Sequence, residues 1–154
     1  MTTSDSPVGQ QPFARIVIGI DFSRSSENAL HLARARFPNA ERLLIHVLDA
    51  RAAAVPDLSG AGTIPTFPSA EMLSTLSETD RAQLDKLTEV GESQETVIGD
   101  PASALVDAAK QWGAELIVVG SHQQGAIERF FVGSVAEQVL KKAQVPVLVV
   151  KVGG

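Results

Sequence analysis

The sequence contains no cysteine and no tyrosine, and its aromatic residues are six phenylalanines and one tryptophan. Without cysteine the chain can form no disulfide, no thiolate zinc site and no cysteine nucleophile. So few aromatic side chains argue against an RNA-binding surface of stacked rings, and they leave the core to aliphatic residues and alanine.

The sequence also lacks a basic balance and long hydrophobic runs. Its net charge is -5, and the lysines and arginines are scattered, which argues against nucleic-acid binding. No apolar run approaches the roughly 18 residues that span a bilayer. The segment from Met1 to Pro12 is polar and has no basic start, so it does not read as a signal peptide. We therefore expect a cytoplasmic protein that binds neither nucleic acid nor membrane.

The length of 154 residues suits one domain with a single core. Residues 1–12 read as a disordered polar tail, and residues 13–154 as the domain. Residues 50–67 are rich in alanine, glycine and proline and show no clear period. This segment is longer than most connections within a domain, so we expect a flexible lid or an oligomer contact.

Several short apolar runs alternate with segments of helical periodicity. Strands are predicted at 15–20, 43–48, 94–98, 116–119 and 145–152. Three of these runs are mainly apolar, and residues 116–119 are continuously aliphatic, which is typical of parallel strands buried on both faces. The polar run 94–98 and the strand containing Pro146 suit sheet edges. With four helices between the strands, the sequence predicts an α/β fold: an open five-stranded parallel sheet covered by helices on both faces.

The stretch from Leu116 to Leu140 reads as a strand, a glycine-bearing loop and a helix. Gly120 ends the strand, and Gly133-Ser134 opens the helix, where Ser134 and Glu137 are spaced as a capping box. Backbone N–H groups of such a loop and helix start can converge on one anion. A capped helix without any ligand would explain the same two residues.

Known phosphate and catalytic motifs are absent: the sequence has no GxxxxGK[ST], no GxGxxG after the first strand and no GxSxG. Ligands of open parallel sheets bind beyond the carboxyl ends of the strands. If the strand ending at Ile20 neighbours the one ending at Val119, then Asp21 faces the glycine loop. By itself Asp21 is more typical of a turn residue or N-cap than of a ligand contact. No catalytic residue is predicted, and enzymatic activity would be at most a slow ATPase.

The spacing from Gly120 through position 123 to Gly133-Ser134 resembles the G-2x-G-9x-G-[S/T] loop of the universal stress protein family. The segments IVIGIDFSRSSENAL, LIHVLD, IGDPASALVDAA, ELIVVGSH and GSVAEQVLKKAQVPVLVVK resemble that family from about Arg15 to Lys151. The resemblance implies a Rossmann-like, adenine nucleotide alpha hydrolase-like fold with strand order 3-2-1-4-5. It also implies a homodimer through the last strands and, in one branch of the family, ATP binding.

Carried over by position, the resemblance places Asp21 and Val47 along adenine and ribose, and the glycine loop around the phosphates. The implied nucleotide-binding set is Asp21, Val47, Val119, Gly120, His122, Gln123, Gly125, Gly133, Ser134 and Val135. Gln123 departs from the pattern, because it replaces the middle glycine. In a left-handed backbone this side chain would cost roughly 1 to 2 kcal/mol, whereas in an ordinary one its amide could donate to phosphate.

No metal site is predicted, since three separated histidines without a carboxylate cluster do not form one; Mg²⁺ would arrive with ATP. His46 reads as a core histidine with satisfied hydrogen bonds, and His31 as a residue on a solvated helix face. The exposed apolar strand at Val145 to Val150 needs cover, and homodimerisation would provide it.

Two hypotheses follow. The first is a universal stress-type module that binds adenine nucleotide and regulates the stress response through unknown protein partners. The second is a nucleotide-free dimeric interaction protein of the same fold, in which Gln123 has impaired the loop.

Overall fold

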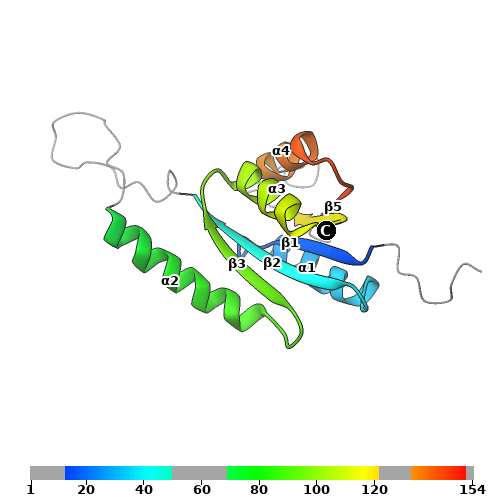
Figure 1. Cartoon of the computed structure of the whole chain (residues 1–154), viewed down its shortest axis with the longest axis horizontal. Helices are drawn as coiled ribbons and strands as arrows, with labels where there is room; N and C mark the ends of the chain where they lie inside the picture. Colours follow the sequence, from blue (N-terminus) through cyan, green and yellow to red (C-terminus); the bar gives the residue numbers. More distant parts are fainter. Residues whose placement is uncertain (1–12, 50–68, 122–132, 152–154) are drawn as a thin grey trace, which may run out of the picture.

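The computed structural model describes residues 13–49, 69–121 and 133–151, and these form an open five-stranded sheet flanked by four helices (Figure 1). The strand order is β3-β2-β1-β4-β5, and all four strand pairings are parallel. In chain order the elements are β1 (Arg15–Gly19), α1 (Arg24–Arg36), β2 (Glu41–Leu48), α2 (Ala70–Leu87), β3 (Ser93–Ile98), α3 (Pro101–Trp112), β4 (Leu116–Gly120), α4 (Ser134–Lys142) and β5 (Val147–Val150).

The predicted fold class and strand order are confirmed. The polar strand β3 and the proline-preceded strand β5 are the two edges of the sheet, as the sequence predicted. β5 is shorter than the predicted run 145–152, because it begins only after Pro146. Proline has no N–H to donate, although its carbonyl still accepts from Ile117 N at 3.1 Å.

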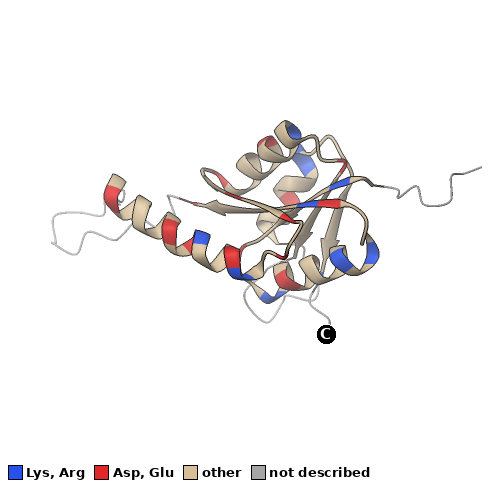
Figure 2. Ribbon diagram, turned by 60° about the horizontal axis from the view of Figure 1, so that its bottom comes forward, with Lys and Arg blue, Asp and Glu red and all other residues tan. Residues whose placement is uncertain are grey.

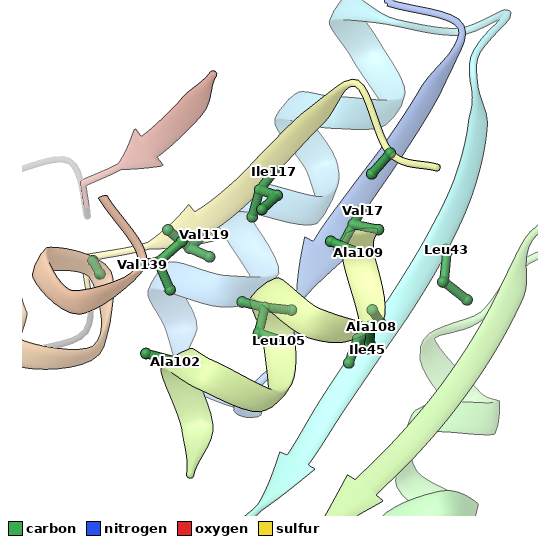
Figure 3. Packing of buried hydrophobic residues seen from close by; sticks show 12 residues of the cluster. Val17, Leu43, Ile45, Ala102, Leu105, Ala108, Ala109, Ile117, Val119 and Val139 are labelled. Atoms are coloured by element: carbon green, nitrogen blue, oxygen red, sulfur yellow. The ribbon is translucent and has the colours of Figure 1, made fainter. Parts of the chain in front are cut away.

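Successive residues of the central strands point to opposite faces, and each face has its own hydrophobic layer. One layer joins Val17, Ile45 and Ile117 to α3 and α4 through Leu105, Ala109 and Val139 (Figure 3). The other joins Ile16, Ile18 and Val118 to α1 and α2 through Leu30 and Leu84. Because both faces are covered, residues 16–18 of β1 and residues 116–119 of β4 are all aliphatic.

Side chains cap the amino termini of three helices. Ser23 caps α1 by accepting from Ser26 N, Ser69 caps α2, and Asp100 caps α3 by accepting from Ser103 N. Gly113 ends α3 with a left-handed backbone, at φ 80°. Charged residues are spread along α2 (Figure 2), where Leu84 is the one buried residue of that helix.

None of the helices in the described ranges is long and apolar enough to cross a membrane. The predicted polar tail at residues 1–12 and the predicted flexible segment at 50–67 lie outside the described residues.

Candidate functional site

A pocket opens at the carboxyl ends of β1, β2 and β4, where the chain winds to opposite sides of the sheet. This reversal point is the usual ligand site of open parallel sheets. The sequence predicts that Asp21 faces the glycine loop if the strands before them are neighbours. β1 does pair directly with β4. The pocket is lined by Gly19, Ile20, Asp21, Ser26, Ile45, Val47, Pro101, Leu105, Val119, Gly120, Ser134, Val135 and Ala136.

Most of the predicted nucleotide-binding residues meet in this pocket. Those that line it are Asp21, Val47, Val119, Gly120, Ser134 and Val135. Gly133 is buried next to the pocket wall at the start of α4 but is not among the lining residues. His122, Gln123 and Gly125 lie outside the described residues, so the prediction about the substituted loop glycine stays a prediction.

The pocket wall divides into an apolar part and a polar part. Ile45, Val47, Leu105 and Val119 provide aliphatic surface. Ser26, Pro101 and Ser134 lie in the first turns of α1, α3 and α4, so the amino termini of three helices face the same space. Helix amino termini carry partial positive charge and unpaired N–H groups, which favour an anion. The pocket therefore suits a ligand with one apolar part and one anionic part.

The turn after β1 is held by its own hydroxyl and carboxylate groups. Asp21 Oδ1 accepts from Ser23 N at 2.9 Å and also from the Ser23 hydroxyl. Asp21 N donates to Ser26 Oγ at 3.3 Å, and Phe22 between them has a left-handed backbone, at φ 62°. Asp21 is thus both the turn residue and the pocket residue that the sequence left as alternatives.

Gly120 allows β4 to lie directly against the first turn of α1. A Cβ at this position would lie 2.5 Å from the carbonyl carbon and Oγ of Ser25 and 2.6 Å from Ser26 N. Both serines are buried. The glycine is therefore required by this close approach, whatever ligand occupies the pocket.

The predicted capping box at the start of α4 is wrong. The N-cap residue is Gly133, which has an extended backbone at ψ 154°, and no side chain makes a cap hydrogen bond there. Ser134 is the first residue of the helix itself, where a side chain no longer has the extended backbone that capping needs. Its hydroxyl is exposed and lines the pocket.

Sequence reasoning missed the pocket residues contributed by core positions. Leu105 belongs to the apolar stripe of α3, and Ile45 lies in the middle of β2. Their positions in the sequence pattern are typical of core residues. Both do belong to the hydrophobic core, and both also line the pocket. Ser26 had a local signal in the run of hydroxyl residues that follows β1.

His46 is a buried histidine with both ring nitrogens in hydrogen bonds, which confirms the prediction for it. One of its partners is Asp80 of α2, the polar residue that interrupts the apolar stripe of that helix. His31 lies on the exposed face of α1, as predicted.

Comparisons with a family model, with known sequences and with solved structures point to the same family. The sequence model of the universal stress protein family matches residues 12–151. The universal stress protein MJ0577 of Methanocaldococcus jannaschii is 32% identical, over 90% of this chain and 95% of the relative. The solved structure of MJ0577 matches with a TM-score of 0.72, at 28% identity over 92% of this chain and 97% of the other.

Two further solved structures are universal stress proteins in complex with nucleotides. One, in complex with cAMP, matches with a TM-score of 0.53 at 26% identity, over 90% of this chain and 96% of the other. One from Archaeoglobus fulgidus, in complex with dAMP, matches with a TM-score of 0.54 at 25% identity, over 89% and 97%. The family match, the relatives and the fold together show that the chain belongs to the universal stress protein family.

Proposed function

We propose that this protein binds an adenine nucleotide, ATP, in the pocket beyond β1, β2 and β4, and that binding regulates its role in the stress response. The observation that carries the proposal is the pocket itself, in which an aliphatic wall faces the amino termini of three helices. The adenine nucleotides bound by two structural relatives support the choice of ligand.

The pocket offers a separate surface for each part of a nucleotide. The base would lie against Val47 and Leu105, where burial of its flat face is favourable. The phosphates would lie at the first turns of α1 and α4, where helix amino termini favour an anion, and the Ser134 hydroxyl would donate to anionic oxygen. A ribose hydroxyl would donate to the Asp21 carboxylate. Mg²⁺ would accompany ATP.

We propose binding rather than catalysis as the function. The carboxylate that lines the described pocket, Asp21, holds the adjacent turn through Ser23. ATP turnover, if measured, would be slow, because hydrolysis needs a residue that positions water and a group that neutralises developing charge. We further propose that the protein acts in the cytoplasm through protein partners.

Replacing Ser134 with alanine is expected to weaken ATP binding about tenfold or more, since a hydrogen bond to a charged group contributes about 1.5 to 3 kcal/mol. Stability should change by less than about 0.5 kcal/mol, because Ser134 is exposed and makes no cap hydrogen bond. Titration calorimetry with Mg²⁺ and ATP, in parallel with thermal melting, measures both quantities.

Ser103→Ala is the matched control, because Ser103 lies in the first turn of α3 but is not a pocket residue. Gently purified wild-type protein should also carry adenine nucleotide detectable by mass spectrometry. Absence of bound nucleotide together with no calorimetric signal for ATP would overturn the proposal in favour of a nucleotide-free interaction protein.

We also propose a homodimer through the last strand, from Val145 to Val150. The carbonyls of Pro146 and Val150 accept from Ile117 and Ser121, so these residues face β4. By the alternation of a strand, Val147 and Val149 present their backbone groups to the opposite, outer side. This apolar edge is a ready surface for a second copy of the strand.

Val149→Pro is expected to convert the dimer to a monomer, because it removes an outward N–H while leaving the residues that face β4 unchanged. Sedimentation of wild type and variant over a range of concentrations measures the effect. A monomeric wild type, or a variant that still dimerises with unchanged affinity, would contradict this mode of association.

A further inference from the structure

His46 connects helix α2 to the turn that forms one side of the pocket. It lies in β2 directly before the pocket residue Val47, but its side chain is on the opposite face of the sheet, the face covered by α1 and α2. Its Nδ1 is 2.7 Å from the carbonyl oxygen of Ile20, and its Nε2 is 2.8 Å from Asp80 Oδ2. The ring also packs on Phe22, with centroids 4.6 Å apart.

Both hydrogen-bond partners of the ring are acceptors. A backbone carbonyl cannot donate, and an ionised carboxylate cannot donate either. A neutral imidazole has one N–H and can satisfy only one of them, whereas the protonated ring donates to both. The ring therefore joins an acceptor on the turn after β1 to an acceptor on α2.

The Ile20 end of this arrangement reaches the pocket directly. Ile20 and Asp21 both line the pocket, and the peptide that joins them carries the carbonyl held by His46. Ile20 N donates to the carbonyl of Ile45 in β2 at 2.8 Å. The position of Asp21 thus depends on two contacts with β2, one of which is a side chain whose own orientation is set from α2.

The hydrogen bond to Asp80 helps to hold α2, a helix with few buried residues, against the sheet. Among the residues of α2, Leu84 is buried, one turn after Asp80. Helix α2 covers the edge formed by β2 and β3 (Figure 1). A polar contact that is 2.8 Å long and mostly shielded from solvent, with Asp80 21% exposed, is therefore a substantial part of how α2 docks.

We propose that His46 and Asp80 are positioning residues that hold the turn from Ile20 to Phe22 in its nucleotide-binding conformation and couple the docking of α2 to ligand affinity. The proposal rests on the proposed binding of an adenine nucleotide. It assigns to α2, which contributes no residue to the described pocket wall, a role in controlling that pocket. A partner or modification that displaces α2 would then lower nucleotide affinity.

The test compares ATP affinity, measured by calorimetry with Mg²⁺, in wild type, Asp80→Ala, Asp80→Asn and Glu78→Ala. Asp80→Ala should weaken binding about fivefold or more, as typical couplings between sites do, and amide hydrogen exchange along α2 should become faster. Glu78→Ala is the matched control, because it removes the same charge from the exposed face of the same helix.

Asp80→Asn distinguishes positioning from general loss of stability. An asparagine amide can donate to Nε2 while Nδ1–H donates to the Ile20 carbonyl, so affinity should be largely restored. If wild type binds ATP and Asp80→Ala binds equally well, the coupling is overturned while the proposed function stands. If wild type binds no ATP, both fail.

Discussion

Replacing Glu92 with alanine is expected to lower the free energy of unfolding by about 3 kcal/mol, because it leaves two partly buried arginines without their common partner. The Glu92 side chain is 1% exposed, and those of Arg34 and Arg42 are 17% and 15% exposed. Arg34 Nη2 lies 2.6 Å from Glu92 Oε1, and Arg42 Nε lies 2.7 Å from Glu92 Oε2. Equilibrium urea unfolding at neutral pH measures the loss.

The same carboxylate predicts how stability depends on pH. Burial by itself raises the pKa of Glu92, but hydrogen bonds from Arg34, from the Glu89 backbone N–H and from Arg42 outweigh it and lower the pKa from 4.5 to about 2. The folded state therefore binds the proton less readily than the unfolded chain. Its contribution to stability is complete above pH 4.5 and is lost as the pH falls from there to about 2.

Unfolding of Glu92→Gln at a series of acidic pH values checks this sign. The stability difference from wild type should be largest above pH 4.5 and shrink toward pH 2, where the wild-type carboxyl becomes neutral as well. Glu41→Ala is the control, since Glu41 is 72% exposed and pairs with Arg15 at 3.5 Å, so its loss should cost less than about 1 kcal/mol. Equal effects at positions 41 and 92 would contradict the assignment.

Replacing Gly120 with alanine is expected to destabilise the protein by about 3 kcal/mol and to weaken ATP binding as well. The added Cβ would lie 2.5 to 2.6 Å from atoms that include backbone of Ser25 and Ser26. Backbone cannot turn aside as a flexible side chain can, so the first turn of α1 must move away from β4. That movement displaces Ser26 and Ser134 relative to each other, and both line the pocket.

Gly99→Ala is the matched control for this substitution. Gly99 also follows a strand, but its added Cβ would meet only the Ala104 Cβ, at an ordinary 3.5 Å. The melting temperatures of the two variants should therefore differ by several degrees, and ATP titration should show weaker binding only for Gly120→Ala. A Gly120→Ala variant that melts and binds ATP like wild type would show that the close approach of β4 and α1 contributes neither to stability nor to binding.

The elements of the fold could be predicted because their signals are local. Short apolar runs specify β1, β2 and β4, and Asp100-Pro101 with Gly113 mark the two ends of α3 within its own sequence. The polar run at β3 and Pro146 before β5 identified the two edges. The order of the strands came from the family resemblance, because periodicity does not say which strands are neighbours.

The site was predictable where strand ends and family pattern agreed, as at Asp21, Val47 and Gly120. It was wrong at the start of α4, where the spacing of Ser134 and Glu137 matched a capping box but Gly133 took the N-cap position. A one-residue difference in where the helix begins changes the role of Ser134 from a cap to a pocket residue. Spacing alone cannot resolve such a difference.

By itself, the sequence of this protein determined the kind of sheet, the two ends of α3 and the family to which the chain belongs. The tertiary structure decided which polar residues act together. Glu92 meets Arg34 and Arg42 across 58 and 50 residues, and Asp80 meets His46 across 34. No local pattern in the sequence marks these pairs, because burial and pairing arise only when distant segments pack, and the energy of a charge depends on that packing.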